Sequence, residues 1–337
     1  MASRPRVVLA MAPALTPDLF TPALRERLAA IAEVPDPEPL QRFDDERAAR
    51  LLASADVLLS GWGCPRIDAE LLSRAPRLRA IVHAAGTVKG HVDEVAWARG
   101  VRVSSAAAAN AVPVAEYTLA AILLASKRAF RLQRLYRDVR GFRLWPREVP
   151  APLGSLGRTV GIVGASRIGR LVLEWLRPFD FARLVHDPFL APDEARALGA
   201  EPVELDALLA RADVVSLHAP LLPETRGLLD RRRLALLRDG AVLVNTARGA
   251  LVDMQALTDE LASGRIDAVL DVTEPEVLPA DSPLYELPNV FLTPHVAGAM
   301  GAETQRLAAL AIDEIERLAR GEPLAHEVRR EDLARVA

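Results

Sequence analysis

The chain has 337 residues, of which 50% are hydrophobic and 26% are charged, and its formal net charge at pH 7 is −3. This is the composition of a globular protein of two ordinary domains, and it offers no large positive charge for binding nucleic acid or an anionic membrane. The single cysteine, Cys64, excludes an internal disulfide and a cysteine metal cluster, and no metal-ligand spacing is evident, so no metal is predicted.

Targeting signals are not evident either. Residues 1–6 lack the apolar segment of a signal peptide, and no apolar stretch reaches about 18 residues without a charge. We therefore expect a protein of the reducing cytoplasm that does not span a membrane.

Short apolar runs alternate with helical patterns along the whole chain, which is typical of parallel α/β architecture. In the first third, helices are predicted at residues 22–33 and 44–53. Four strands are predicted around them, at residues 6–11, 55–61, 78–84 and 101–105. These elements suffice for a small α/β domain. A long helix is predicted next, from residue 112 to about residue 138.

Aromatic residues concentrate in and after that helix. Five of the fifteen aromatic residues are Tyr117, Phe130, Tyr136, Phe142 and Trp145. The prolines that follow, Pro146, Pro150 and Pro152, cannot continue a helix. An aromatic helix followed by a proline-rich arm indicates a surface buried in a partner subunit, and ordinary packing within the chain is the alternative.

A second α/β series begins at residue 159. Six strands are predicted, at residues 159–164, 182–187, 213–218, 241–246, 268–272 and 290–295. Six strands with intervening helices fit a doubly wound sheet of two mononucleotide-binding halves. A last amphipathic helix, at residues 302–319, is expected to pack on the first domain.

The fold class predicted is therefore α/β, with two doubly wound parallel-sheet domains and an active-site cleft between them. Residues 1–103 and 298–337 are expected to form a discontinuous, flavodoxin-like substrate domain. Residues 104–297 are expected to form a Rossmann cofactor domain.

The segment VGIVGASRIGR, residues 160–170, has the pattern of a strand, a tight turn and a helix start. Gly164 suits the turn, and Gly169 lets the helix approach the strand. The helix N-terminus at Ser166, Arg167 and Ile168 offers free N–H groups to a pyrophosphate. Ser166 stands where the GxGxxG pattern has its middle glycine, so the match is imperfect.

The next strand ends at Asp187, where a carboxylate can accept hydrogen bonds from the adenosine ribose and would repel a 2′-phosphate. This favours NAD over NADP. The neighbouring Arg170 and Arg183 leave NADP as the alternative.

Three side chains at strand ends suit redox chemistry on a small 2-oxo acid. Arg248 has a planar, permanently charged fork that can hold a carboxylate and polarise a carbonyl. His295 can supply a proton near neutral pH, and Glu276 can pair with it. Asp271 can accept a hydrogen bond from the nicotinamide carboxamide. All of them would lie at the carboxyl edge of one sheet, where such sheets bind ligands.

As a set, these motifs resemble the D-isomer-specific 2-hydroxyacid dehydrogenase family over about residues 50 to 320. The matching segments are residues 161–169, Asp187, residues 244–253 (VNTARGALVD), residues 270–272 with Glu276, and residues 293–298 (TPHVAG). The resemblance implies that Arg248, Glu276 and His295 are a catalytic triad, and that the protein is a homodimer through its cofactor domain.

The resemblance also implies a substrate side. Asn110 matches a substrate-binding asparagine, and the loop Ala85-Gly86-Thr87 matches a backbone cradle for the substrate carboxylate, followed by an unusual Val88-Lys89-Gly90. The predicted cofactor contacts beyond the glycine turn and Asp187 are His218, Ala219, Pro220, Thr246, Ala247, Asp271 and Gly298.

The function predicted is an NAD-dependent oxidoreductase that transfers a hydride between NAD(H) and C2 of a small D-2-hydroxy acid or 2-oxo acid. Glu276 argues against a formate dehydrogenase relative, because that branch has Gln there, whereas a short phosphoglycerate dehydrogenase stays possible. The alternative of another class is a non-enzymatic, NADH-responsive binding protein, as in the corepressors of the same family.

Overall fold

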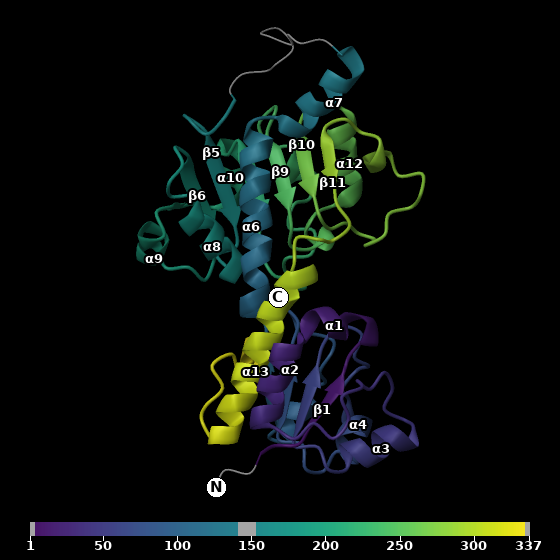
Figure 1. The fold of residues 1–337 in the computed structure, drawn as a ribbon. Coiled ribbons are helices and arrows are strands. Elements are labelled where there is room, and N and C mark those ends of the chain that lie inside the picture. Colours follow the sequence, from purple (N-terminus) through teal and green to yellow (C-terminus); the bar gives the residue numbers. More distant parts are fainter. Residues whose placement is uncertain (1–3, 141–152, 334–337) are drawn as a thin grey trace. The chain divides into compact units, whose positions relative to one another are not determined.

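The computed structural model describes residues 4–140 and 153–333, and the chain divides into two compact units (Figure 1). Unit 1 comprises Met1–Ala111 and Ala299–Ala337, and unit 2 comprises Val112–Gly298. The chain thus leaves the first unit after Ala111 rather than after residue 103, and it returns after Gly298 rather than after residue 297.

Unit 1 is built on a four-stranded parallel sheet in the order β1-β2-β3-β4. Its strands are β1 (Val7–Ala10), β2 (Val57–Ser60), β3 (Ala80–His83) and β4 (Arg102–Ser105). Each lies within a strand predicted from the sequence. Helices and 3₁₀ turns surround them: η1 (Pro13–Leu15), α1 (Thr16–Leu19), α2 (Pro22–Ile31), α3 (Glu46–Leu52), α4 (Ala69–Arg74), α5 (Val95–Ala98), η4 (Gly301–Glu303), α13 (Thr304–Arg320) and η5 (Arg330–Asp332).

The chain beside the outer edge of β1 forms only two isolated bridges to it instead of a regular strand. A flavodoxin-like sheet places its second strand beyond the first, and here Glu33 and Leu40 pair with Arg6 and Ala10 only through isolated bridges. The segment between them, VPDPEP at residues 34–39, alternates proline with other residues. Proline has no N–H to give to a ladder, so a regular strand cannot form there.

The sheet of unit 1 is buried on both faces because alternate strand residues face opposite sides. One face, with Leu9, Leu59 and Val82, packs on α1, α2 and α13. The other face, with Val8, Leu58 and Ile81, packs on α3, α4 and α5. Helices α2 and α13 lie side by side although far apart in sequence (Figure 1).

Unit 2 holds a seven-stranded, entirely parallel sheet in the order β11-β10-β9-β8-β5-β6-β7. Its strands are β5 (Thr159–Val163), β6 (Ala182–His186), β7 (Glu201–Pro202), β8 (Val214–Leu217), β9 (Val242–Asn245), β10 (Asp267–Leu270) and β11 (Val290–Leu292). The order reverses between β5 and β8, as in a doubly wound nucleotide-binding sheet. Strand β7 was not predicted, because two residues ending in proline give no apolar run.

Helices cover both faces of this sheet. One core, with Ile162, Val214 and Val244, packs on α6, α8 and α9. The other, with Val215, Leu243 and Leu270, packs on α10, α11 and α12. The helices and 3₁₀ turns of this part of the chain are α6 (Ala107–Ser126), α7 (Ala129–Val139), α8 (Arg167–Trp175), α9 (Pro192–Ala197), α10 (Leu205–Arg211), α11 (Arg231–Leu234), η2 (Gly249–Leu251), α12 (Met254–Ala262) and η3 (Pro283–Tyr285).

The single long helix predicted from residue 112 is two helices, α6 and α7, and the prediction was wrong on this point. Arg128 separates them with a left-handed backbone, φ +54°. Its guanidinium donates hydrogen bonds to the Asp267 carboxylate and to the Gly240 carbonyl oxygen. This buried pairing compensates for the break in the helix, and periodicity alone does not report it.

By length and composition alone, α6 is long and apolar enough to cross a membrane, the one such helix among the residues that the structure describes. The core helices of globular proteins pass the same test. In unit 2, Ala115, Ala121, Ile122 and Ala125 of α6 are buried in the core against the sheet.

Two aromatic residues of the segment predicted to bind a partner subunit contact other residues of the same chain. Phe130 stacks on Phe291 with ring centroids 4.0 Å apart, and the Tyr117 hydroxyl is hydrogen-bonded to Thr293. Tyr136 is exposed. The other members of the predicted arm, Phe142, Trp145, Pro146, Pro150 and Pro152, lie outside the described residues.

Candidate active site

The turn between β5 and α8 is packed too closely for any residue but glycine at two positions. Gly164 has φ +95°, and a Cβ on it would lie 2.6 Å from the backbone N of Ala219. A Cβ on Gly169 would lie 2.1 Å from the Gly164 carbonyl oxygen. Both distances are far below van der Waals contact, so the two glycines bring the start of α8 against the strand ends as expected.

Ser166 explains the departure from the glycine pattern. It is the N-cap of α8 with φ −63° and ψ 178°, an extended conformation that any residue adopts, and its hydroxyl accepts a hydrogen bond from the Gly169 N–H at 3.4 Å. The backbone therefore does not require glycine here. Arg167 and Ile168 follow in the first turn of α8, where unpaired N–H groups favour an anion.

Asp187 lies against this turn at the end of β6. Its Oδ2 accepts a hydrogen bond from the Ala165 N–H at 2.7 Å, and its Oδ1 accepts from the Phe189 N–H at 2.8 Å. Two backbone donors thus fix the carboxylate beside the turn. One hydrogen bond to each oxygen leaves acceptor capacity on both, as ribose hydroxyls require.

Arg170 and Arg183, which left NADP as the alternative cofactor in the sequence, both bind other groups of the protein. Arg170 donates to the Ala165 carbonyl oxygen and pairs with Glu194 at 2.6 Å. Arg183 donates to the carbonyl oxygens of Gly199 and Leu176. Neither side chain is held ready for a 2′-phosphate, so the turn fits NAD.

His218 lies beneath the turn rather than on an open surface. Its side chain is buried, its Nε2 is 2.9 Å from the Ser216 hydroxyl, and burial lowers its pKa to about 3. The ring is therefore neutral at physiological pH, and the backbone of His218 and Ala219 packs closely against Gly164. Thr246, also a predicted cofactor contact, is buried and shares a hydrogen bond of 2.9 Å with the Thr118 hydroxyl.

Arg248 follows β9 in a loop clamped by Asn245. The Asn245 Oδ1 accepts from the Ala247 N–H, and its Nδ2 donates to the Arg248 carbonyl oxygen. Burial lowers the pKa of the Arg248 guanidinium, and the charge of Glu276 acts in the opposite direction. A partly desolvated cation attracts an anion more strongly than a fully hydrated one. The loop therefore holds a preorganised cation that can attract an anion.

His295 and Glu276 are directly paired: the His295 Nδ1 is hydrogen-bonded to the Glu276 Oε1. The carboxylate accepts, so Nδ1 carries the proton and Nε2 is the ring nitrogen that can exchange a proton with a substrate. The side chains are 49% and 55% exposed, which leaves both accessible. His295 has a left-handed backbone, φ +54°, an uncommon conformation for a residue other than glycine.

Asp271 holds the loop that carries His295. It is 1% exposed. Its Oδ1 accepts from the Thr293 hydroxyl at 2.6 Å and from the Val296 N–H at 2.9 Å, and its Oδ2 accepts from the Ala297 N–H at 2.9 Å. The His295 N–H donates to the Asp271 carbonyl oxygen. Asp271, which follows β10, thus fixes the loop of His295, and its contact with a nicotinamide stays a prediction.

In unit 1, the predicted substrate residues meet. A Cβ on Gly86 would lie 3.6 Å from the Asn110 Nδ2, so the amide lies beside the loop Ala85-Gly86-Thr87. The Asn110 Oδ1 accepts from the Ala299 N–H at 3.0 Å, which orients its Nδ2 as a donor. The Thr87 hydroxyl accepts from the Lys89 N–H and shapes the loop.

Four positioning residues received no such role from the sequence: Tyr117, Asn245, Thr273 and Thr293. The Thr273 hydroxyl donates to the carbonyl oxygens of Pro275 and Glu276. Asn245, Thr273 and Thr293 lie within motifs that the sequence singled out, so proximity to Arg248, Glu276 and His295 was an available signal. Tyr117 is distant in sequence, and no signal pointed to it.

Comparisons with known proteins identify the family of the chain. Residues 119–297 match the family described as "D-isomer specific 2-hydroxyacid dehydrogenase, NAD binding domain". D-3-phosphoglycerate dehydrogenase of Mycobacterium leprae is 40% identical over 311 residues, which are 90% of this chain and 57% of the relative. The chain thus spans little more than half the length of this relative.

Two further proteins are similar over most of their own length. Glyoxylate reductase of Korarchaeum cryptofilum is 36% identical over 269 residues, 79% of this chain and 80% of the relative. The crystal structure of D-lactate dehydrogenase from Aquifex aeolicus, complexed with NAD and lactic acid, superimposes with a TM-score of 0.71 at 26% identity, covering 94% of this chain and 96% of that one. NAD is the cofactor that these matches support, and the chain belongs to the D-isomer-specific 2-hydroxyacid dehydrogenase family.

Proposed function

We propose that this protein is an NAD-dependent dehydrogenase or reductase that interconverts a small D-2-hydroxy acid and its 2-oxo acid. The observation that carries the proposal is the paired His295 and Glu276 together with Arg248, whose cationic group is influenced by the Glu276 charge. These residues supply a proton donor, a group that orients it and an anion-binding cation. A 2-oxo acid needs all three when it is reduced.

Bound NADH supplies the hydride for C2 of the substrate. Arg248 binds the substrate carboxylate and polarises the carbonyl oxygen through its fork of N–H donors. The His295 Nε2 gives its proton to the alkoxide oxygen as it forms, and the Glu276 carboxylate orients the ring by accepting a hydrogen bond from Nδ1. In the oxidative direction, His295 accepts the proton of the hydroxyl group.

On the substrate side, we propose that the backbone of Ala85-Gly86-Thr87 binds the carboxylate and that the Asn110 Nδ2 donates to the substrate. The relatives act on 3-phosphoglycerate, glyoxylate and D-lactate according to their names. The common part of these molecules is the 2-hydroxy or 2-oxo carboxylate, which is the part that the proposed residues recognise.

For the cofactor, we propose that the first turn of α8, from Ser166 to Gly169, binds the pyrophosphate and that Asp187 binds the adenosine ribose. The remaining contacts proposed are Gly164, His218, Ala219, Pro220, Thr246, Ala247, Asp271 and Gly298. The fit of the glycine turn and the two fixed oxygens of Asp187 support this assignment.

We also propose a cytoplasmic homodimer that pairs through unit 2. Leu124, Tyr136 and Val139, on α6 and α7, are large apolar side chains left exposed, as expected of a surface that a second copy covers. Sedimentation velocity tests the assembly: a dimer that dissociates in a Leu124→Glu/Tyr136→Glu variant is the expected result. A monomeric wild type would contradict it.

The activity is tested by loss of NADH absorbance with glyoxylate, hydroxypyruvate, pyruvate, phenylpyruvate, 2-oxoisocaproate and 3-phosphohydroxypyruvate, with NADPH in parallel. We expect turnover of at least one acid and a higher kcat/KM with NADH than with NADPH. NADH binding without turnover of any acid would instead favour an NADH-responsive binding protein.

The role of His295 is tested by His295→Ala. We expect kcat to fall by roughly 10²- to 10⁴-fold, because the alkoxide loses its proton donor, while NADH affinity stays near that of the wild type. His326→Ala, in unit 1, is the matched control and should leave kcat unchanged. A wild-type kcat in His295→Ala would remove His295 from the mechanism.

A further inference from the structure

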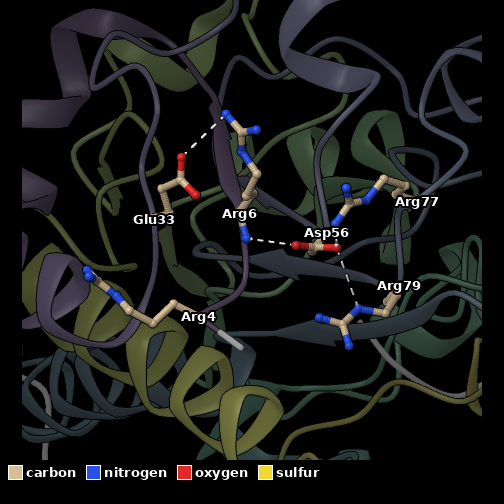
Figure 2. A pocket seen from close by; sticks show the side chains of 6 residues that line it. All are labelled: Arg4, Arg6, Glu33, Asp56, Arg77 and Arg79. Carbon is tan, nitrogen blue, oxygen red and sulfur yellow. Dashed lines mark hydrogen bonds and ion pairs between the residues drawn. The ribbon is translucent and has the colours of Figure 1, made fainter. Parts of the chain in front are cut away.

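Unit 1 contains a basic cavity at the amino ends of its strands, opposite to the carboxyl ends that carry the substrate loop. The cavity has a volume of about 470 Å³ and is lined by Arg4, Arg6, Glu33, Asp56, Arg77 and Arg79 (Figure 2). Arg6, Asp56 and Arg79 directly precede β1, β2 and β3, respectively. We call it the amino-edge cavity.

The sequence places the arginines of this cavity in two Arg-x-Arg pairs, Arg4-Pro5-Arg6 and Arg77-Leu78-Arg79. The middle residues, Pro5 and Leu78, are buried. The arginines therefore reach the cavity from both sides of Asp56 while the apolar residues between them join the core.

The carboxylates of Glu33 and Asp56 bind only some of the N–H donors of the arginine side chains. Asp56 accepts the Arg6 backbone N–H at 2.9 Å, and its Oδ1 lies 3.3 Å from Arg77 and 3.9 Å from Arg79 (Figure 2). Glu33 pairs with Arg6 at 3.4 Å. These are long ion pairs compared with the usual 2.7–2.9 Å of charge-assisted bonds. Four guanidinium charges less two carboxylate charges leave a formal charge of +2.

The guanidinium groups are also accessible. Arg77 and Arg79 have side chains that are 60% and 59% exposed. The Nε of Arg6 is buried and has no hydrogen-bond partner among the described residues, an unmet donor at the cavity wall. The Arg4 guanidinium donates hydrogen bonds to the carbonyl oxygens of Ala29 and Ala32, at the end of α2, and adds positive charge to the cavity.

We propose that the amino-edge cavity binds a small phosphorylated molecule through its phosphate group, at a site separate from the substrate loop. A phosphate group carries about two negative charges near neutral pH and several acceptor oxygens, which match the charge of +2 and the planar donors of Arg77 and Arg79. The volume leaves space for more than the phosphate itself. Arg79 and the loop Ala85-Gly86-Thr87 lie at opposite ends of β3, so the ligand is not the substrate of the reaction.

The test is calorimetric titration of the whole protein, saturated with NADH, with inorganic phosphate and with glycerol 3-phosphate, a phosphate monoester. Citrate, which has only carboxylates, is titrated in parallel at matched ionic strength. We expect saturable binding of both phosphate probes to the wild type, and tighter binding of the monoester because it fills more of the cavity. Binding of citrate alone, or of no probe, would overturn the proposal.

Variants locate the site. Arg77→Gln/Arg79→Gln should weaken phosphate binding by roughly tenfold or more, with wild-type kcat in the absence of phosphate. Glu33→Gln removes a competing carboxylate and should bind phosphate more tightly than the wild type does. Arg50→Gln/Arg99→Gln removes two exposed charges of unit 1 outside the cavity and should change nothing. Equal binding by the wild type and Arg77→Gln/Arg79→Gln, or an equal loss in the control, would contradict the assignment.

Discussion

At the scale of the residue, the candidate site depends on Gly249 as much as on Arg248 before it. A Cβ on Gly249 would lie 2.0 Å from the Thr273 carbonyl carbon and 2.5 Å from the Glu274 N. The loop after β9 therefore touches the backbone of the loop that carries Glu276. This contact explains why Arg248 and Glu276 influence each other electrostatically, and it needs a residue without a side chain.

Gly249→Ala should accordingly displace one of the two loops. We expect a loss of roughly 1–3 kcal/mol or more in the free energy of unfolding, together with a fall in kcat, because Arg248 moves relative to Glu276. Urea unfolding and steady-state kinetics measure the two effects. Gly61→Ala is the matched control, since its Cβ would lie 3.4 Å from Met11 at the nearest. Unchanged stability and kcat in Gly249→Ala would refute this account of the loop contact.

At the scale of the element, side chains at the ends of strands β10 and β11 form a series of hydrogen bonds that shapes the loop of His295. The Thr293 hydroxyl donates its single proton to the Asp271 Oδ1, so Tyr117 on α6 must be the donor in its 2.7 Å contact with the Thr293 oxygen. A helix and two strand ends thus hold the backbone of His295, whose positive φ needs such support.

Thr293→Val keeps the side-chain shape and removes this hydroxyl. We expect a fall in kcat of roughly tenfold with NADH affinity retained, because His295 loses its fixed position, and a stability loss of about 1–3 kcal/mol from the bonds left unmade. Tyr117→Phe removes only the outer bond and should have the smaller effect on both. If Thr293→Val kept the wild-type kcat, the chain of hydrogen bonds would not position His295.

The elements also show how far the sequence predicts this protein. Hydrophobic period and apolar runs predicted ten of the eleven strands found in residues 4–140 and 153–333, since buried parallel strands are short hydrophobic runs. Strand β7 and the break at Arg128 were not predictable, because each depends on contacts made elsewhere in the fold. The same holds for the site: the motifs indicated Arg248, Glu276 and His295, whereas the bonds of Tyr117 join residues distant in sequence.

At the scale of the whole molecule, each unit buries a neutral histidine at a strand end. Burial lowers the pKa of His83 to about 3, with a smaller contribution from the neighbouring His91, and burial lowers the pKa of His218 to about 3. The Nδ1 of His83 lies 2.9 Å from the Ser60 hydroxyl, and the rings of His83 and His91 are 4.7 Å apart. Both histidines take up a proton near pH 6.5 once the chain unfolds.

Between about pH 6.5 and about pH 3, the unfolded chain therefore binds more protons than the folded one, and stability falls as the pH falls. Each histidine should lower the free energy of unfolding by up to roughly 1.4 kcal/mol per pH unit in this window. Urea unfolding followed by circular dichroism, at intervals from about pH 7 to about pH 5, measures the slope.

Substitution separates the two histidines. His83→Asn keeps a polar group near Ser60 and should reduce the slope of the free energy of unfolding of unit 1 against pH. His218→Asn should reduce the corresponding slope for unit 2. Surface carboxylates such as Asp44, whose pKa the Arg42 guanidinium lowers to about 2, contribute equally to wild type and variants. The difference in slope therefore isolates each buried imidazole. A His83→Asn protein with the wild-type slope would mean that His83 is already protonated in the folded state, or that the unfolded chain keeps it buried.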